Sequence, residues 1–509
     1  MRLAAAVLLV CALMVPAAEQ GTAFFPVALD YPLSPGAPVS AIATDLEAIR
    51  AAGFNAIKVT VTWRDGEAMR GTYVTESIAR ALAQAGRAGL RVILAVDDTP
   101  PVWLFERYAD AARQTSTGRS SDACFDHPGV HADETAFLKA IATEASRHEA
   151  LLAIDVGSRT PAGLCLCPYT KRRMKSLTAM DGRDDHARAR IMRRHDLGDL
   201  AAAAASSRVD TASRTSLPSL LSDPRAFAQD DWLMAGVVDR YGVTLNARSA
   251  IRLATDDLAG AGRGKSWWVE VDASVPDADR RLATWTAISR GAQGVIFDDP
   301  PRDLTFLPSV ARNPILFTQL RPRRAQVALL FDPLMPTAKP DSLAATHQAL
   351  YGRQVAADIF NVEHLAAADL RGYRAIVATS SRALSARARE AIAAARGAGA
   401  TYVEAARGGG TLDALLQAGV SPEVRIAGGS DIEVRFLESP TVQMIIALNH
   451  ASHSQRVTMT FSPETQEAIW LNMETGTGVN FVAGPTGPNH HYWFRPKDAL
   501  VLMIRKDIR

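Results

Sequence analysis

Residues 56–61 (AIKVTV) and 91–96 (RVILAV) are the stretch of sequence that decides the fold. Each run has the length and apolar character of a buried strand, and the segment between them, 75–88, repeats its apolar side chains with the period of a helix. A strand, a helix and a second strand in this order form the basic unit of a parallel sheet. The two runs therefore predict an α/β architecture from the first hundred residues.

The same alternation continues from residue 24 to about residue 320. Further strand-like runs are 151–156 (LLAIDV), 267–271 (WWVEV) and 294–297 (GVIF), and helical patterns cover 45–52 and 134–147. Nearly 300 residues of alternating strand and helix suit a closed (β/α)8 TIM barrel. Residues 172–216 have little strand character, and we expect helix and loop there.

Two smaller domains are predicted after the barrel, which agrees with about three domains for 509 residues. Residues 323–422 combine strand-like runs with helical stretches and predict a small doubly wound α/β domain. The strands are expected at 327–331, 373–378 and 400–404, and the helices at 343–357 and 384–397. Residues 425–509 contain only alternating, strand-like runs and predict an antiparallel, sandwich-like β domain.

Composition and charge restrict the functional classes. There are 56 Lys and Arg against 54 Asp and Glu, so the net charge of +2 gives no electrostatic reason to propose a nucleic-acid partner, whose phosphates need a basic face. Residues 1–18 resemble a signal peptide, with Arg2, an apolar stretch and a cleavage site of small residues. A buried first helix and a lipid anchor at Cys11 are the alternatives. No later stretch is long and apolar enough for a membrane span, so we expect an exported protein, periplasmic or extracellular.

The reactive groups of such a barrel stand at the C-terminal ends of its strands. Glu270 ends the strand 267–271, where a carboxylate suits the nucleophile of a glycosidase, although a salt bridge at the rim is the alternative. Asp155 is expected to face the barrel interior, about two residues below the exit of its strand. The exit position itself is Arg159, which cannot exchange a proton near neutral pH.

From Phe25 onward the chain resembles glycoside hydrolase family 42, the β-galactosidases with a trimerisation domain. The motifs run in the family's order: GFN at 53–55, then Trp63, Glu67, Gly71 and Tyr73, PVWL at 101–104, WWVE at 267–270 and GAQGV at 291–295. The resemblance implies a retaining β-galactosidase-like enzyme that acts on β-linked galactosides or related glycans.

Carried over residue by residue, the resemblance makes Glu270 the nucleophile. At the exit of the fourth strand the family has Asn-Glu or Ser-Glu, whereas this chain has Ser158 and Arg159. Ser158 is then a substrate-binding residue, and Arg159 occupies the position of the acid/base. The missing proton would have to come from Asp155, Asp231, Asp298 or the substrate. The alternative is a catalytically inactive carbohydrate-binding or scaffold protein on a glycosidase frame.

The resemblance also implies a cysteine cluster. Cys124, Cys165 and Cys167 match three of the four positions that hold a structural zinc ion in the family, and Thr170 stands at the fourth. Three thiolates can hold zinc with water or with a nearby His127 as the fourth ligand. In an exported protein, a disulfide from Cys124 to one of the pair is the alternative. No cofactor is required for the reaction itself.

Two further expectations concern binding. Trp63 and Trp268 are the indoles predicted to stack on a sugar, with packing in the core as the alternative. The second domain resembles class I glutamine amidotransferases, but no Cys follows residue 167, so that activity is excluded. We expect this domain to be structural and, by resemblance, to lie at the contacts of a homotrimer.

Overall fold

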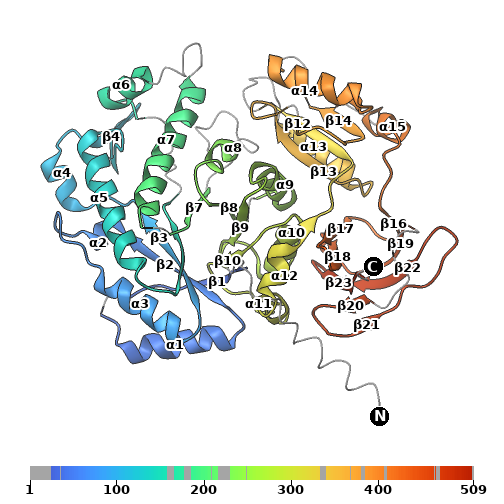
Figure 1. Ribbon diagram of the computed structural model, residues 1–509, viewed down its shortest axis with the longest axis horizontal. Coiled ribbons are helices and arrows are strands. Elements are labelled where there is room, and N and C mark those ends of the chain that lie inside the picture. Colours follow the sequence, from blue (N-terminus) through green and yellow to red (C-terminus); the bar gives the residue numbers. More distant parts are fainter. Residues whose placement is uncertain are drawn as a thin grey trace.

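The computed structural model describes residues 24–34, 36–157, 165–176, 185–207, 209–215, 230–247, 249–332, 340–366, 368–379, 384–405, 410–462, 465 and 470–506. Three bodies are visible: a barrel, an α/β domain and a β domain (Figure 1). The barrel forms the left half of this view, and the two smaller domains lie above one another on the right. The segment predicted as a signal peptide lies outside the described residues.

Eight parallel strands close into the predicted barrel, in the spatial order β1-β10-β9-β8-β7-β6-β3-β2. They are β1 (Val27–Asp30), β2 (Ala56–Thr62), β3 (Arg91–Asp97), β6 (Leu151–Asp155), β7 (Thr211–Thr215), β8 (Arg240–Leu245), β9 (Ser266–Val271) and β10 (Val295–Phe297). A hairpin of β4 (Ala112–Thr115) and β5 (Gly118–Ala123) is inserted after β3. The TIM-barrel prediction is therefore confirmed.

Helices surround the barrel. They are α1 (Val39–Ala51), α2 (Trp63–Gly66), α3 (Glu76–Arg87), α4 (Val102–Arg107), α5 (Pro128–Ala145), α6 (Pro168–Ser176), α7 (Asp185–Ala205), α8 (Asp231–Met234), α9 (Ile251–Ala261), α10 (Asp277–Ser289), α11 (Leu307–Ala311) and α12 (Pro314–Gln319). None of the helices in the described ranges is long and apolar enough to cross a membrane.

The interior of the barrel is filled around one indole, packed by aliphatic side chains. Trp268 on β9 is 1% exposed and packs in a cluster with Ile93, Ile296, Leu152 and the alanines of neighbouring strands. Gly242 on β8 makes room for the indole, because a Cβ atom there would lie 2.5 Å from Cδ1 of Trp268. The barrel is thus a packed core beneath its C-terminal rim.

The α/β domain contains a four-stranded parallel sheet in the order β13-β12-β14-β15. Its elements are β12 (Val327–Phe331), α13 (Pro340–Tyr351), β13 (Ala357–Asn361), β14 (Ala375–Ala378), α14 (Ala386–Gly397), β15 (Thr401–Glu404) and α15 (Gly410–Gln417). The first strand, β12, lies between β13 and β14, so the order of strands reverses there. This is the arrangement of a doubly wound sheet, as predicted.

The β domain contains two antiparallel sheets. The larger has the order β11-β17-β18-β23-β20-β21 and the smaller the order β16-β19-β22. The strands are β11 (Arg321–Pro322), β16 (Val424–Ala427), β17 (Ile432–Glu438), β18 (Val442–Asn449), β19 (Gln455–Phe461), β20 (Trp470–Asn472), β21 (Gly478–Val479), β22 (Asn489–Phe494) and β23 (Ala499–Arg505). Strand β11 comes from the linker after the barrel, so the linker is itself part of this domain.

Two details of the predicted elements were wrong. Residues 172–216 contain the barrel strand β7, which escapes a hydrophobic pattern because its buried residues, Thr211, Ala212 and Ser213, are small or polar. The helix predicted at 343–357 ends at Tyr351, and Gln354 has a φ of 57°. A left-handed residue there turns the chain into β13, a strand that the pattern did not indicate.

Candidate active site

The candidate nucleophile lies where the sequence predicts it, on the inner side of the barrel wall. Glu270 is two residues beyond Trp268 on β9, so alternation directs both side chains inward. Its side chain is 6% exposed, and its Oε1 atom lies 3.0 Å from Nζ of Lys58. The carboxylate therefore stands just above the packed interior, beside a buried cation.

Lys58 is the centre of the site, and the sequence analysis did not single it out. It lies in the middle of β2, its side chain is 7% exposed, and its Nζ contacts three carboxylates. These are Asp30 at 3.1 Å, Glu270 at 3.0 Å and Asp298 at 3.5 Å. The signal that could have identified it is a charged residue inside an otherwise apolar strand. Lys58 is two residues from the inward-facing Ala56, so its side chain faces inward too.

The strands of this site explain why these groups meet. Asp30 is the last residue of β1 and pairs in register with Lys58 on β2. Asp298 follows β10, whose residue Ile296 pairs with Glu270. The ends of three neighbouring parallel strands thus bring the carboxylates to the C-terminal rim, as the barrel geometry requires.

The residues predicted to supply a proton are placed differently from one another. Asp155 faces the barrel interior and is fully buried, with Oδ1 accepting a hydrogen bond from the Gly157 amide at 3.0 Å. Asp231 lies on α8, where Tyr241 donates to it at 2.7 Å, away from the Lys58 cluster. Ser158 and Arg159 lie outside the described residues. Asp298 and Glu270 share the contact with Lys58.

The two indoles predicted to bind sugar are enclosed. Trp268 fills the barrel, and Trp63 is 0% exposed, with Nε1 donating to Glu67 at 2.7 Å. Trp63 also stacks on Phe137. Because a sugar needs an open ring face, this structure places both indoles in the core, the alternative that the sequence left open. The Trp63–Glu67 pair instead fixes the loop at Gly71, whose amide donates to Glu67 at 2.6 Å.

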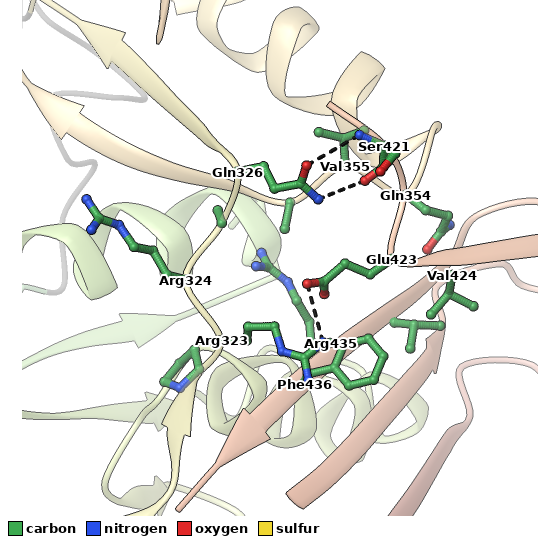
Figure 2. Close-up of a pocket in the computed structure, with 14 residues that line it drawn as sticks. Arg323, Arg324, Gln326, Gln354, Val355, Ser421, Glu423, Val424, Arg435 and Phe436 are labelled. Atoms are coloured by element: carbon green, nitrogen blue, oxygen red, sulfur yellow. Dashed lines mark hydrogen bonds and ion pairs between the residues drawn. The ribbon is translucent and has the colours of Figure 1, made fainter. Parts of the chain in front are cut away.

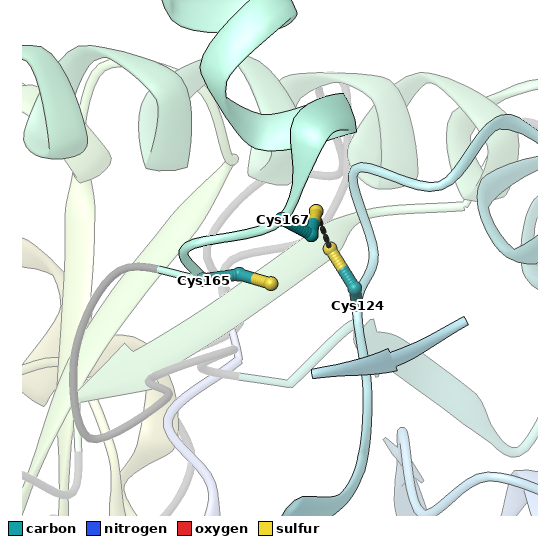
Figure 3. A group of neighbouring side chains, drawn as sticks. All are labelled: Cys124, Cys165 and Cys167. Carbon is teal, nitrogen blue, oxygen red and sulfur yellow. Dashed lines mark hydrogen bonds between the residues drawn. The ribbon is translucent and has the colours of Figure 1, made fainter. Parts of the chain in front are cut away.

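The three cysteines come together, as the resemblance implies (Figure 3). Their sulfur atoms lie within 4.8 Å of one another, on the segment after β5 and on the chain leading into α6. The distance from Cys124 Sγ to Cys167 Sγ is 3.4 Å, far longer than a disulfide bond of about 2.05 Å. Tetrahedral zinc holds sulfurs about 3.8 Å apart, so the cluster fits the size of a zinc site.

The electrostatics of the cluster also suit a metal. The hydrogen bond between Cys124 and Cys165 lowers the pKa of Cys165 to about 5 and, together with burial, raises the pKa of Cys124, so Cys165 is the thiolate, the form that zinc binds. Thr170 Oγ1 lies 3.5 Å from Cys124 Sγ and 3.4 Å from Cys167 Sγ, and it donates a hydrogen bond to Asp126.

His127 does not point at the sulfurs. Its Nδ1 accepts from the amides of Gly129 and Val130 at the start of α5, and its Nε2 lies 3.4 Å from Asp110. His127 as fourth ligand, one alternative of the sequence analysis, is thus wrong, because both ring nitrogens have other partners.

A separate pocket lies between the α/β domain and the β domain, beside the linker that follows the barrel (Figure 2). It is lined by Arg323, Gln326, Glu423, Phe436 and neighbouring residues, and Arg323 lies 3.4 Å from Glu423. Its volume of about 30 Å³ holds water but no sugar.

The fold and the rim together define a class: a (β/α)8 barrel protein with an inward-facing, buried carboxylate near the C-terminal end of a barrel strand. The family model of the Glyco_hydro_42 β-galactosidases matches residues 35–179. No curated protein matches the chain by sequence.

Solved structures extend the likeness to almost the whole chain. A catalytic mutant of Gan42B, a GH42 β-galactosidase from G. stearothermophilus, is 12% identical with a TM-score of 0.75, covering 95% of this chain and 99% of that one. The β-galactosidase from Bacillus circulans sp. alkalophilus has the same identity and coverage with a TM-score of 0.73. α-L-Fucosidase isoenzyme 2 from Paenibacillus thiaminolyticus is 10% identical with a TM-score of 0.66, covering 94% and 99%.

These findings confirm the resemblance. The family model matches residues 35–179, and the fold is similar to that of family 42 β-galactosidases over 95% of the chain.

Proposed function

We propose that this protein is an exported, retaining glycoside hydrolase that acts on β-linked galactosides or related glycans, with Glu270 as its nucleophile. The observation that carries the proposal is the position of Glu270, an inward-facing carboxylate at the end of a barrel strand, 3.0 Å from the buried ammonium of Lys58. The ammonium stabilises the negative charge that a nucleophilic carboxylate needs.

The reaction follows from these groups. A carboxylate oxygen of Glu270 attacks the anomeric carbon, the bond from that carbon to the leaving-group oxygen breaks, and a glycosyl ester forms. The leaving oxygen takes up a proton. Water then attacks the same carbon and gives up a proton, the ester bond breaks, and the sugar leaves with Glu270 ionised again. Because two displacements occur at one carbon, its configuration is retained.

Asp298 is our candidate for the proton transfers. Its Oδ1 atom and Oε1 of Glu270 both contact Lys58 Nζ, at 3.5 and 3.0 Å. The distance between these two oxygen atoms is therefore at most the sum of those two distances. That limit is compatible with the spacing of about 5–5.5 Å in retaining enzymes. The Asp298 side chain is also 26% exposed, whereas Asp155 is fully buried.

Hydrolysis of an aryl β-galactoside with a good leaving group tests the nucleophile. Glu270→Gln should lower kcat by at least about 10³-fold, whereas Glu47→Gln, an exposed change on α1, should leave it unaltered. Asp298→Asn should spare kcat/KM for this activated substrate, whose first step needs no proton donor, but lower that for an alkyl β-galactoside about 10²-fold. Activity that survives Glu270→Gln would refute the proposal.

The second candidate function is a catalytically silent sugar-binding protein. It is favoured by Arg159, which the resemblance places where the acid/base Glu is expected. The same assay separates the two functions. If the unaltered protein binds galactosides but hydrolyses neither substrate, and Arg159→Glu creates activity, the protein is a sugar-binding protein without catalytic activity.

We also propose that Cys124, Cys165 and Cys167 hold a structural zinc ion. The fit rests on their three clustered sulfurs, and the ion would join the hairpin β4–β5 to α6 without entering the reaction. Assembly as a homotrimer through the α/β domain stays a prediction from the resemblance. Sedimentation of the full chain measures it directly.

A further inference from the structure

The smaller sheet of the β domain presents one face to water. In β19, Gln455, Val457, Met459 and Phe461 are buried while the residues between them are more exposed, and β16 and β22 alternate in the same way. The outward-facing residues are Arg425 and Ala427 on β16, Arg456, Thr458 and Thr460 on β19, and Asn489, His491 and Trp493 on β22. We call this set the outer face. In Figure 1, strands β16, β19 and β22 lie on the side of the β domain away from the barrel.

Trp493 is the unusual member of the outer face. It is 66% exposed, and among the described residues no other Phe, Tyr or Trp side chain is as exposed. Its neighbours Tyr492 and Phe494 point the other way, and they contact each other in the core of the domain. Alternation along β22 therefore holds the indole in water, where it adds nothing to the packing of the fold.

Hydrogen-bonding groups surround the indole. Arg456 is directly opposite Trp493 in the register of β19 and β22. Thr458 Oγ1 lies 2.8 Å from His491 Nδ1, and Thr460 donates to Asn489 Oδ1 at 2.6 Å. Both pairs join side chains of the outer face across neighbouring strands.

The charge of the outer face has one sign. Strands β16, β19 and β22 contain Arg425 and Arg456 but no acidic residue. Within the described parts of the chain, neither guanidinium has a carboxylate at ion-pair distance, unlike Arg323 or Arg435 nearby. Arg425 pairs in register with Thr460, four residues from Arg456, so the two charges stand about 13 Å apart along the strands.

We propose that the outer face binds an extended polysaccharide that carries uronate groups, a binding site separate from the barrel. The apolar C–H face of one sugar ring would lie on Trp493, and Arg456 and Arg425 would each hold a carboxylate with paired, charge-assisted hydrogen bonds. His491, Asn489 and the threonines supply the hydroxyl contacts. The choice of a saccharide rests on the proposed function, and the choice of uronate rests on the unpaired arginines.

Electrophoresis of the full-length protein through gels containing polygalacturonate, with neutral galactan as the comparison, tests this binding. Polygalacturonate should retard the protein, and added salt should weaken the effect. Trp493→Ala should weaken the binding at least about tenfold, and Arg456→Gln should weaken it and reduce its salt dependence. Arg505→Gln, an exposed change on the other sheet, is the matched control and should bind as the natural protein does.

Equal retardation of Trp493→Ala and the natural protein would overturn the inference, and so would equal retardation by galactan and polygalacturonate. If Trp493→Ala instead changes the sedimentation of a protein that neither polymer retards, the outer face is a contact between copies, which also overturns it. Hydrolysis of a soluble aryl galactoside should be the same in Trp493→Ala. Absence of that hydrolysis in every variant, with retardation intact, would refute the proposed hydrolase and leave this site standing.

Discussion

Oε1 of Glu433, on strand β17 of the β domain, lies 2.8 Å from the guanidinium of Arg290, which follows helix α10 of the barrel. The two side chains are only 2% and 1% exposed. Asp256 on α9 completes the cluster, at 2.9 Å from both Arg290 and Arg435. His347 on α13 contacts Asp256 at 2.9 Å, so the cluster joins all three domains. Burial raises the pKa of Glu433, but Arg290 and His450 outweigh it and hold that pKa below its usual value.

Removing one charge from this cluster should destabilise the protein strongly. Glu433→Gln would leave Arg290 and Arg435 buried with too little negative charge, which typically costs about 3–5 kcal/mol. We expect a marked fall in the midpoint of urea unfolding.

The matched control for this change is Glu438→Gln, on the same strand. Glu438 also contacts two cations, Arg323 and Lys506, but its side chain is 35% exposed. Its loss should cost about 1 kcal/mol or less. Equal midpoints for the two variants would show that burial of the Arg290–Glu433 pair does not matter to stability.

A second prediction concerns pH. Burial raises the pKa of Asp257, on helix α9, to about 7, and the hydrogen bond from Trp232 only partly opposes the shift. An unfolded Asp has a pKa of about 3.9. The folded state therefore holds a proton that the unfolded state has lost, and stability should fall between about pH 4 and pH 7, by up to about 4 kcal/mol.

Asp257→Asn should flatten this dependence, because the amide mimics the protonated acid and still accepts from Trp232. Unfolding midpoints at pH 4.5, 6 and 8 measure it. Asp413→Asn, an exposed change on α15, should keep the dependence of the natural protein. If the fall in stability with pH persists in Asp257→Asn, other groups cause it. Asp231 would then be the next residue to substitute, since burial raises its pKa too.

The zinc proposal makes its own prediction. Purified protein should contain about one zinc per chain, and a chelator should lower the melting temperature, because the ion joins β4–β5 to α6. Cys167→Ser should lose the metal. Thr170→Cys should bind it more tightly, since a fourth thiolate would replace the hydroxyl that lies 3.4 Å from Cys167 Sγ. Metal analysis that finds no zinc in the natural protein or in Thr170→Cys would refute the site.

The fold could be predicted from the sequence wherever buried strands are made of large apolar residues. Runs such as 91–96 and 267–271 match β3 and β9 closely, and their alternation with helices indicates a parallel barrel. Strand β7 could not be found in this way, because its buried side chains are Thr211, Ala212 and Ser213. Hydrophobic periodicity registers large side chains, and this part of the barrel uses small ones.

The site was only partly predictable for a different reason. Glu270 stands out because it follows an apolar strand, but its partner Lys58 lies 212 residues away and meets it only when the barrel closes. The indoles show the converse error. Trp268 next to Glu270 suggested a sugar platform, yet Gly242 on the neighbouring strand leaves the space that buries it. Contacts between strands distant in sequence decided both outcomes.

Lys58 therefore provides the sharpest test of the candidate site. Lys58→Met keeps much of the volume of the side chain but removes the cation between Asp30, Glu270 and Asp298. Hydrolysis of an activated aryl galactoside should fall about 10²-fold or more, mainly in kcat, because no ammonium group would stabilise the charge that develops around Glu270. Lys58→Arg, which keeps the positive charge, should recover part of the activity.

The pH profile separates this role from a merely structural one. Without the ammonium, negative charge on Glu270 is less favourable, so the carboxylate should take up a proton at higher pH. The acid limb of the kcat/KM profile should move upward in Lys58→Met and stay near its original place in Lys58→Arg. A uniform loss of activity at every pH, with an unshifted limb and a lowered melting temperature, would mean that Lys58 only holds the barrel together. An upward shift in a protein that melts normally would mean that the 3.0 Å contact keeps Glu270 ready to attack.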